Sequence, residues 1–421
     1  MGLVDSLSSK TEGARAEALR RGVARLADAG LQTGGLPLSI ELPDGSRLEF
    51  GAPARMLLRI CDPALLTELA SPTLGALGDA FVAGRLEIEG DLLEALPIGV
   101  GLVEAVGSTT AQRALHTWVQ HRRAQDRAAI GHHYDVGNEF YELWLDRRMV
   151  YSCAYYRSGD ETIDEAQAAK LDHVCRKLRL APGERLLDVG CGWGALVMHA
   201  VRQYGVRAVG ITLSANQARL ATDRLRQAGL GDRAEVLLLD YRDLPKRFAA
   251  NSFDKAASIG MFEHVGLRNL PSYFAALAAV LRDRGLFLNH GITSTDVECR
   301  PVGSGVSDFI NHRVFPHGEL PHLHVAVREM SAAGFEVADI ESLRPHYART
   351  LAAWYRRLEA RNAEAARLVS AETLRTWRIY LAGCSYGFEQ GWVNVYQLLG
   401  SLIRRPGLTE LPLTRDWIYS S

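Results

Sequence analysis

A glycine turn is the first feature of the sequence whose residue types and spacing could support chemistry. An apolar run ends near Asp188, and three glycines follow it at every second position: Gly190, Gly192 and Gly194. Glycines between a strand and a helix let a ligand approach the backbone at the carboxyl end of the strand. The spacing is GxGxG rather than the GxGxxG of most dinucleotide folds, and no P-loop GK[ST] follows. The turn therefore predicts a site for a nucleotide-like cofactor.

No pattern in the sequence is typical of a bound metal, so we expect no metal site. The six cysteines lie far apart, and no two have the CxxC spacing of a zinc ribbon. Glu263-His264 does not form an HExxH motif, which excludes a zinc peptidase. The cysteine spacing does not suggest a disulfide scaffold either, and this indicates a reducing, cytosolic compartment.

Strands that alternate with helices must position the glycine turn. The predicted strands are 185–189, 206–211, 234–239, 253–259 and 285–290, and the predicted helices between the first three are 195–204 and 215–228. This alternation is typical of an α/β fold with a parallel, doubly wound sheet. Residues 346–404 are rich in Trp, Tyr and Arg, and they are predicted to form further helices as an insertion or lid.

The first quarter of the chain has a different character. Residues 1–34 predict a helix, and residues 36–42 alternate with period two before a hairpin turn at Asp44-Gly45. Residues 1–109 are therefore expected to form a small α+β domain without a phosphate loop.

A basic linker helix is expected over residues 110–130. Its arginines Arg113, Arg122, Arg123 and Arg127 face a single acid, Asp126. A charge run of this kind is usually a solvated helix face. The alternative is contact with anionic phosphate groups at a membrane surface.

Length and composition limit the class of protein. The chain has 421 residues, of which 47% are hydrophobic and 23% charged, as in ordinary globular proteins of two or three domains. The net charge of -1 disfavours a nucleic-acid partner, because nucleic-acid-binding domains are usually basic. No apolar run approaches the roughly 20 residues that span a bilayer, and the N-terminus does not look like a secretory signal.

Seven ordered segments resemble the motifs of the cyclopropane-fatty-acid synthase family, which includes the mycolic acid cyclopropane synthases. They are HYDVGNEFYELWLD (133–146), YSCAYY (151–156), LLDVGCGWG (186–194), GITLSANQ (210–217), GMFEHVG (260–266), FLNHGIT (287–293) and FINHRVFPHGELP (309–321). The resemblance covers residues 130–360 densely and includes Tyr347. It implies a Rossmann-like class I methyltransferase domain with helical lid insertions over residues 131–421.

The resemblance also implies the reaction. The methyl carbon of S-adenosylmethionine is transferred to the double bond of an unsaturated phospholipid acyl chain, and loss of a proton from the resulting carbocation closes a cyclopropane ring. In the family, the proton acceptor is a bound bicarbonate. The positions that match its site are Cys153, Glu263, His290, Ile292 (through its backbone) and Tyr347. Taken alone, a cysteine such as Cys153 is more often a small buried apolar residue.

A second set of residues is assigned to the cofactor by the same resemblance. The set consists of Tyr134, Tyr151, Ser152, Gly190, Gly192, Thr212, Leu213, Gln217, Asp240 and Tyr241. The two glycines are expected at the methionine moiety and the TLSANQ residues near the ribose and adenine. Asp240 and Tyr241 are expected to flank the adenine, and Tyr134 and Ser152 to reach the methionine carboxylate.

Two departures from the family pattern leave the product open. His290-Gly291 stands where His-Thr is often seen, and the C-terminal stretch is longer than in the best-known synthases. This stretch looks closer to a branch with members that make methyl- or methylene-branched fatty acids from the same carbocation. A catalytically silent lipid-binding homologue is the alternative from another class.

The expected partners and location follow from the implied substrate. Membrane phospholipids with unsaturated acyl chains are the expected partner, and a homodimer stays open. We expect a cytoplasmic protein that associates peripherally with the inner face of the membrane. Residues 1–109 would then serve as a domain that docks the protein on the lipid.

Overall fold

The computed structural model describes most of the chain. The described residues are 17, 38–49, 54–68, 72–107, 136–316, 318–405, 407 and 409–419. Only Glu17 of the predicted N-terminal helix is among them. The predicted basic helix over 110–130 and the predicted cofactor residue Tyr134 lie outside the described residues.

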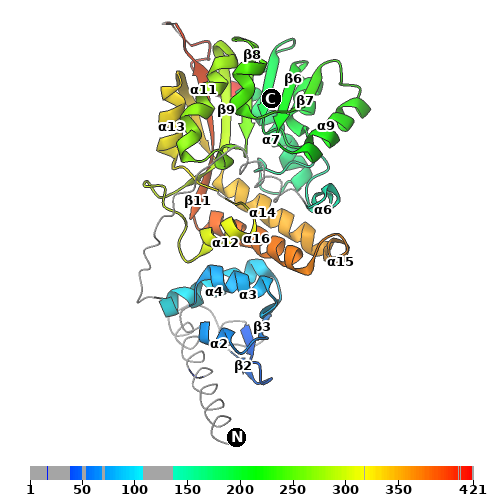
Figure 1. Cartoon of the computed structure of the whole chain (residues 1–421), viewed down its shortest axis with the longest axis vertical. Coiled ribbons are helices and arrows are strands. Elements are labelled where there is room, and N and C mark those ends of the chain that lie inside the picture. The colour runs from blue at the N-terminus through cyan, green and yellow to red at the C-terminus, as the bar shows by residue number, and fades with distance from the viewer. Residues whose placement is uncertain are drawn as a thin grey trace, which may run out of the picture. The chain divides into compact units, whose positions relative to one another are not determined.

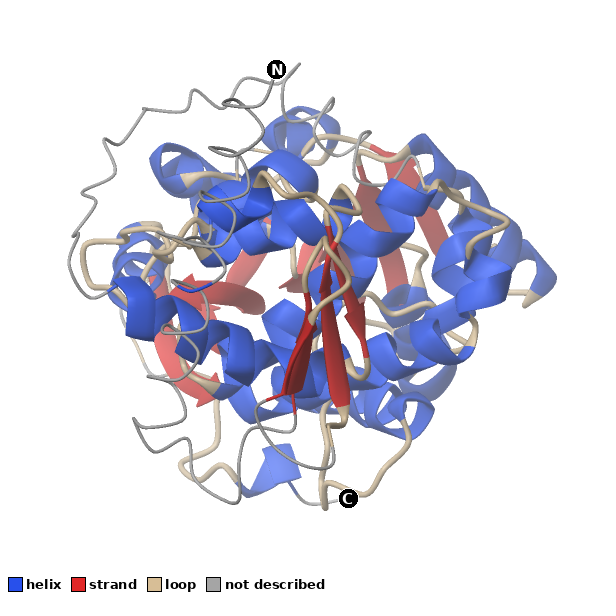
Figure 2. Cartoon of the chain, turned by 90° about the horizontal axis from the view of Figure 1, so that it is seen from below, coloured by secondary structure: helices blue, strands red, loops and turns tan. Residues whose placement is uncertain are grey.

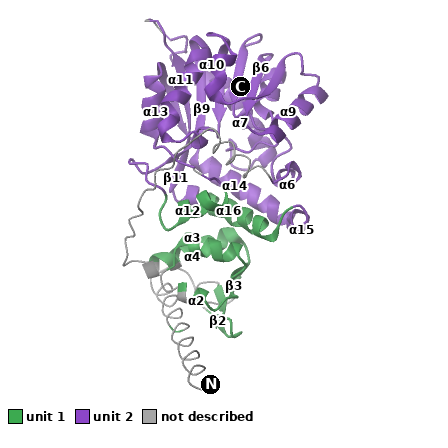
Figure 3. Ribbon diagram, in the orientation of Figure 1, with its two compact units in different colours: residues 1–118, 302–314, 369–386 green, residues 119–301, 315–368, 387–421 purple. Residues whose placement is uncertain are grey.

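Two compact units make up the chain (Figure 3). Unit 1 comprises residues 1–118, 302–314 and 369–386, and unit 2 comprises residues 119–301, 315–368 and 387–421. Two segments from the second half of the chain thus group with the N-terminal residues. The boundaries expected from the sequence, 1–109, 110–130 and 131–421, stay a prediction.

Unit 2 is built on a seven-stranded sheet in the order β10-β11-β9-β8-β5-β6-β7 (Figure 1). The strands are β5 (Arg185–Val189), β6 (Arg207–Thr212), β7 (Ala234–Leu238), β8 (Phe253–Ile259), β9 (Leu281–Ser294), β10 (Phe335–Ser342) and β11 (Val393–Leu402). Strands β5 to β9 are parallel, and β11 runs antiparallel to both β9 and β10. The expected parallel α/β sheet is confirmed.

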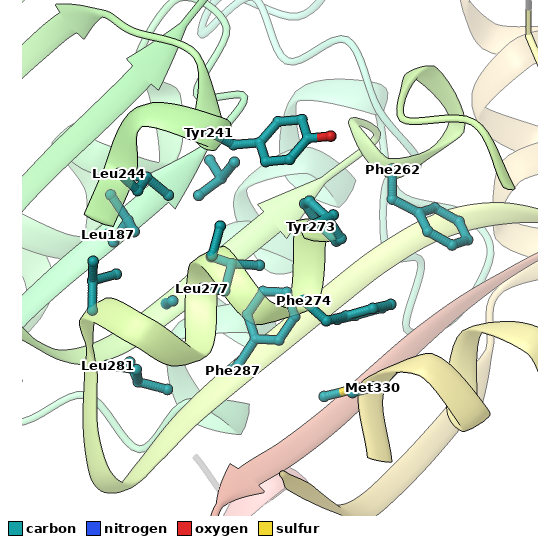
Figure 4. Close-up of a cluster of buried hydrophobic side chains, with 14 of the residues drawn as sticks. Leu187, Tyr241, Leu244, Phe262, Tyr273, Phe274, Leu277, Leu281, Phe287 and Met330 are labelled. Atoms are coloured by element: carbon teal, nitrogen blue, oxygen red, sulfur yellow. The ribbon is translucent and has the colours of Figure 1, made fainter. Parts of the chain in front are cut away.

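Helices cover both faces of this sheet (Figures 1 and 2). The helices of unit 2 are α6 (Asn138–Trp144), α7 (Ile163–Lys177), α8 (Ala195–Tyr204), α9 (Ala215–Gln227), α10 (Leu244–Arg247), α11 (Leu270–Val280), α13 (Leu323–Ala332), α14 (Arg344–Ala360), α15 (Asn362–Ala365) and α17 (Asp416–Tyr419). Of these, α6, α14 and α15 lie beyond the strand ends in Figure 1. Neighbouring residues of a strand face opposite sides. Leu186 therefore packs with α7 and α8, while Leu187 packs with α10, α11 and α13 in the cluster of Figure 4.

The helical prediction for residues 346–404 is correct only in its first part. Helices α14 and α15 are present, and α16 (Ala371–Glu389) follows, but residues 393–402 form strand β11. This strand lies between β9 and β10, and its polar residues Asn394, Gln397 and Ser401 are three and four residues apart, a spacing that fits a helix as well as a strand. Strand β10 was not predicted either.

Unit 1 contains a small sheet in the order β2-β1-β3-β4. Its strands are β1 (Leu38–Glu41), β2 (Arg47–Glu49), β3 (Met56–Ile60) and β4 (Leu86–Glu89), and its helices include α2 (Leu65–Glu68), α3 (Leu74–Val82), α4 (Leu92–Gly107) and α12 (Val306–Arg313). The turn at Asp44-Gly45 joins β1 to β2, and Gly45 has a φ of 81°. The expected small α+β arrangement is thus present.

Side-chain contacts explain why late segments belong to unit 1. The Phe309 ring of α12 lies against Gly78 of α3, where an added Cβ would be 3.2 Å from the ring. Arg313 forms an ion pair with Asp79 at 2.9 Å. Arg375 of α16 donates to the carbonyl of Phe81 at 2.9 Å. These contacts join segments more than 200 residues apart in the sequence.

Within the part of the chain that the structure describes, no helix has both the length and the apolarity that crossing a membrane requires.

Gly210 of β6 gives a test of how the sheet supports the glycine turn. An added Cβ at Gly210 would lie 2.8 Å from the Cys191 sulfur and 3.1 Å from Val197. We expect Gly210→Val to lower the free energy of unfolding by about 1–3 kcal/mol, because overpacking forces its neighbours to move. Urea denaturation measures this. Gly231→Val is the control, because an added Cβ there meets nothing within 4 Å. Equal midpoints for the two variants would contradict this view of the packing.

Candidate active site

The glycine turn lies between β5 and α8, as its sequence predicts. Gly190 and Gly192 have φ values of 81° and 53°, in the left-handed region that favours glycine. The backbone N–H groups of Gly190 and Cys191 both donate to the carbonyl of Ile211, each at 2.9 Å, so β6 holds the turn in place. An added Cβ at Gly190 would lie 2.8 Å from that of Met261, whereas at Gly192 it would meet nothing within 4 Å.

A cavity opens at this turn, at the carboxyl ends of β5, β6 and β8. Of the residues assigned to the cofactor, those that line it are Tyr151, Ser152, Gly190, Gly192, Thr212, Leu213, Gln217 and Tyr241. Asp240 is not among the lining residues, and its carboxylate forms an ion pair with Arg242 at 2.7 Å. The structure therefore gathers most of the assigned set around one cavity.

Several lining residues were not singled out from the sequence. They include Lys170, Trp193, Arg242, Met261 and His264. The signal for Lys170 is present in the sequence, since Lys170 lies three residues after Gln167 and four before Val174 on the buried stripe of α7. A lysine on an apolar helix stripe is a departure from the amphipathic pattern.

The end of β6 is polar without being charged. The Thr212 hydroxyl donates to the Gln217 amide oxygen at 2.8 Å, and the Ser214 N–H donates to the Thr212 oxygen at 3.1 Å. Both Thr212 and Gln217 are buried. Neutral hydrogen-bonding groups beside a glycine turn are able to bind a nucleoside, and the residues present therefore fit this part of the expected cofactor.

Glu263 and Ile292 lie in direct contact beside the cavity. Glu263 is in the short turn η2 (Phe262–His264) after β8, and its Oε1 accepts the Ile292 backbone N–H at 2.7 Å. Burial raises the pKa of Glu263 to about 7. Its second oxygen is buried and has no hydrogen-bond partner among the described residues. The carboxyl group is thus held by one oxygen, and the other oxygen is available to a ligand.

His290 of β9 is two residues before Ile292 and is also buried. Its Nδ1 lies 3.2 Å from the side-chain nitrogen of Gln397, the residue opposite it on β11. Its Nε2 is buried without a partner in the described part of the chain. Burial and the nearby lysines lower the pKa of His290 well below its usual value, so the imidazole is neutral. Gln397 was not predicted, because β11 was taken for a helix.

Cys153 and Tyr347 both lie near the start of α14. The Cys153 thiol donates to the carbonyl of Ala154 at 3.2 Å and lies 3.8 Å from the carbonyl of Leu343, the residue that precedes α14. Tyr347 is in the first turn of this helix and packs against Phe388 with the ring centroids 4.7 Å apart. Burial raises the pKa of Cys153, so the group is a neutral thiol rather than a nucleophilic thiolate.

A series of backbone contacts links the Cys153 and Tyr347 region with Glu263 and Ile292. The Leu343 N–H donates to the carbonyl of Val395 at 2.9 Å, and Val395 lies opposite Ile292 in the β11–β9 pair. Ile292 in turn binds Glu263. The five residues assigned to the anion site therefore belong to one connected region of unit 2, within which Glu263 and Ile292 are directly hydrogen-bonded.

Gly291 has a packing role next to this site. A Cβ at this position would lie 2.2 Å from Cδ1 and 2.4 Å from Cε1 of the Phe262 ring, so any larger residue requires the ring to move. Phe262 directly precedes Glu263, and the missing side chain lets its ring lie against β9. The departure from His-Thr at this position is thus matched by close packing beside Glu263.

Two buried atoms suit an anion that accepts hydrogen bonds and is able to take up a proton. The second oxygen of Glu263 and the Nε2 of His290 both lack partners among the residues described. A protonated carboxyl group and a neutral imidazole are each able to donate a hydrogen bond to an anion. The residues present therefore fit a small oxyanion such as bicarbonate.

Comparisons with known proteins identify the family of the chain. The family model of mycolic acid cyclopropane synthetase matches residues 121–398. A probable fatty acid methyltransferase of Pseudomonas putida is 47% identical over 389 residues, which cover 92% of this chain and 98% of that protein. The cyclopropane-fatty-acyl-phospholipid synthase of Escherichia coli (strain K12) is 38% identical over 269 residues, which cover 64% of this chain and 66% of that protein.

Solved structures give the same result. The cyclopropane synthase MmaA2 from Mycobacterium tuberculosis is 34% identical with a TM-score of 0.62, and it covers 66% of this chain and 98% of its own. The mycolic acid cyclopropane synthase CmaA1, complexed with SAH and CTAB, is 37% identical with a TM-score of 0.61, and it covers 65% of this chain and 98% of its own.

The open space at Gly192 allows a test of the cofactor cavity. We expect Gly192→Val to abolish S-adenosylmethionine binding, because its side chain would stand where the ligand must approach the backbone. Calorimetric titration measures the affinity. Gly229→Val is the matched control, since Gly229 also has a positive φ and open space around it but does not line the cavity. Unchanged affinity in Gly192→Val would remove the cofactor from this cavity.

Glu263 gives a prediction for stability against pH. Its pKa in the folded state, about 7, is above the ordinary value of 4.5, so its contribution to stability is present below pH 4.5 and is lost as pH rises through 7. Glu263→Gln does not ionise, and its amide oxygen still accepts the Ile292 N–H. We expect the variant to gain about 2–3 kcal/mol relative to the parent between pH 5 and pH 8. Denaturation curves at the two pH values test this, and a constant difference would contradict the raised pKa.

Proposed function

Since the chain belongs to the mycolic acid cyclopropane synthetase family of S-adenosylmethionine-dependent methyltransferases, we propose that it acts on the double bonds of unsaturated acyl chains in membrane phospholipids and forms cyclopropane rings. One observation carries the proposal. Glu263, whose Oε1 accepts the Ile292 N–H, and His290 each have one buried polar atom without a partner among the described residues. A methyl transfer to an alkene requires such a place for the departing proton.

The chemistry sets what the site must do. S-adenosylmethionine supplies an electrophilic methyl group at a sulfonium centre. The C–S bond breaks, a C–C bond forms to the alkene, and a proton leaves the added carbon as the ring closes. The acyl chain therefore gains CH2 in total. An alkene is a weak nucleophile that no side-chain base can activate, so the protein must act by positioning and by stabilising positive charge.

Aromatic side chains suit the stabilisation of this charge. Tyr151 packs against Trp144 and Trp354, with ring centroids 5.6 Å and 5.4 Å apart. Tyr347 contacts Trp354 edge to face at 6.2 Å. Aromatic faces stabilise a nearby cation, and their packing excludes the water that would otherwise trap it. These side chains connect Tyr151, which lines the cofactor cavity, with the Cys153 and Tyr347 region.

Glu263 and His290 would assist the removal of the proton. The raised pKa of Glu263, about 7, means that the group is able to exchange a proton near neutral pH. We assign bicarbonate to the space between the two residues as the immediate acceptor, with the Cys153 thiol and the Tyr347 side chain completing its surroundings. The support for this assignment is the pair of orphaned atoms and the matching family positions.

A methylene-branched product is the second candidate. It is favoured by the 47% identity, over 92% of this chain, to a probable fatty acid methyltransferase. A 1,2-hydride shift would first move the positive charge of the same carbocation to the carbon that bears the new methyl group. Loss of a proton from that methyl group would then form the C=CH2 branch, and the gain is again CH2. A saturated methyl branch would need two further hydrogen atoms from a separate reductant.

Membrane association is part of the proposal. Its support is the excess of arginines over acids in residues 110–130, since basic residues near an anionic surface contribute about 1 kcal/mol each. The protein would then reach its substrate from the cytoplasmic side without crossing the bilayer, with residues 1–109 contributing to docking.

Fatty-acid analysis of a bacterial host tests the function. We expect expression of the protein to convert monounsaturated phospholipid acyl chains into species heavier by CH2, with shielded ring protons in the NMR spectrum of the isolated product. Vinylidene protons would instead identify the methylene branch. Glu263→Gln is expected to cost about 100-fold in turnover while it keeps S-adenosylmethionine affinity. An unchanged lipid profile together with intact lipid binding would favour the silent homologue.

A further inference from the structure

Lys170 is a buried cation that the proposed reaction does not yet use. It lies on α7, is 1% exposed and lines the cofactor cavity. Its ammonium group donates one hydrogen bond, to the Ser152 hydroxyl oxygen at 2.8 Å. Among the described residues, no carboxylate lies within ion-pair distance of it. A buried ammonium ion is costly unless it is paired, so this position calls for an explanation.

The other buried lysines of unit 2 differ from Lys170. Lys177 is 0% exposed and lies 2.8 Å from Asp339 and 2.6 Å from Glu341. Lys255 is 6% exposed and lies 3.6 Å from Glu184. Each of these two ammonium groups thus has a carboxylate partner within the protein. Lys170 has a hydroxyl partner and a cavity, and its missing partner is therefore expected to be a ligand.

The direction of the hydrogen bond indicates the chemistry of that ligand. The Ser152 oxygen accepts from Lys170, so its own O–H points elsewhere and is able to donate into the cavity that Ser152 lines. Gln167, one helical turn before Lys170, donates to the Ser152 carbonyl at 2.8 Å and fixes its backbone. An ammonium ion and the hydroxyl donor that it orients form a site for an anionic acceptor such as a carboxylate.

The remaining charges near Lys170 are consistent with a zwitterionic ligand. Asp146 is engaged by the N–H groups of Val150 and Arg148 at 2.7 Å and 3.0 Å. Asp188 lines the same cavity, and burial raises its pKa to about 7. A carboxyl group at this place suits an ammonium ligand, which would favour its ionised form. The Cys153 thiol stays neutral, because burial raises its pKa.

We propose that Lys170 is a positioning residue that, through the Ser152 hydroxyl, fixes the carboxylate of the amino-acid end of the cofactor. The proposal rests on the proposed function only in taking the ligand to be S-adenosylmethionine. Because the carboxylate is several bonds from the sulfonium centre, fixing it restricts where the reactive methyl group lies. Neither Lys170 nor Ser152 takes part in bond making.

A pair of ligands isolates the carboxylate. S-adenosylhomocysteine and its decarboxylated analogue share the adenosine, the thioether and the amino group, and only the first has a carboxylate. For Lys170→Met we expect S-adenosylhomocysteine to bind at least 10-fold more weakly, with the affinity for the analogue within twofold of the parent's. Calorimetric titration measures both. Lys255→Met is the matched control, since it removes a buried lysine that does not line the cavity, and neither affinity is expected to change.

Serine 152 shows whether Lys170 acts through it. Ser152→Ala is expected to cause a selective loss for S-adenosylhomocysteine, and the double variant to lose less than the sum of the two single losses. Independent, additive losses would contradict action through Ser152. Equal weakening of both ligands in Lys170→Met, or no weakening of S-adenosylhomocysteine, would overturn the proposal. If the parent protein binds neither ligand, the proposed function fails instead.

The unmodified protein provides a second measurement that does not depend on the folding of a variant. Burial lowers the pKa of Lys170 to about 8. The ratio of the two affinities is therefore expected to fall at least threefold between pH 7 and pH 9.5, as the ammonium loses its proton. The amino group of the analogue titrates at a higher pH, because it lacks the neighbouring carboxylate, so each affinity is first corrected for the protonation of the free ligand. A ratio that is constant with pH would overturn the role of the Lys170 charge.

Discussion

Burial of ionisable groups at the carboxyl edge of the sheet is the constraint on which the rest of the structure depends. Charge is costly away from water, so each such group is either paired or neutral. Lys177 is paired with two carboxylates of β10, whereas Glu263 and His290 are driven toward their neutral forms. The unpaired groups Glu263 and His290 thus lie where a ligand is able to bind them. The paired Lys177 stabilises the surrounding structure.

Glycines, which have no side chain, allow the close packing that positions the buried ionisable groups. An added Cβ at Gly210 would collide with Cys191, at Gly190 with Met261, and at Gly291 with Phe262. Each of these contacts joins two strand ends or a strand and a turn. The glycine turn is therefore pressed against β6 on one side and against the segment that carries Glu263 on the other. Cofactor cavity and proton-accepting site share this packing, and a larger residue at one glycine would disturb both.

The sequence predicted the half of the sheet whose strands are separated by regular helices. Strands β5 to β8 lie within about one residue of the predicted ranges, because each apolar run is short and is bounded by turns or amphipathic helices. Strand β11 was missed because its polar residues Asn394, Gln397 and Ser401 are three and four residues apart instead of alternating with apolar ones. Gln397, the partner of His290, was missed for the same reason, since cross-strand neighbours are identified only when the strand pairing is known.

The site was predictable to a different degree. Most of the residues assigned from motifs line one cavity or lie in one connected region, since motifs record residues that meet a ligand directly, whereas Asp240 does not line the cavity and Tyr134 is outside the described residues. The contact of Glu263 with the Ile292 N–H is also what a motif-based assignment allowed for. Lys170 belongs to no such motif. The role proposed for Lys170 depends on the burial of its side chain and on its one hydrogen bond to Ser152. Both depend on how α7 packs against the segment that contains Ser152.

The same geometry bears on which product forms. Ring closure and methylene formation would start from one carbocation, and in both the added carbon loses a proton. They differ in whether a hydride shift moves the positive charge before that proton leaves. Glu263 is held by a backbone N–H within strand β9, so a proton acceptor bound to it would also be fixed in place. In the proposed reaction, the product would therefore depend on whether this acceptor removes the proton before the hydride shift occurs. The Phe262 ring packs against Gly291 next to Glu263 and helps to fix where that carboxyl group lies, so this packing bears on the product as well.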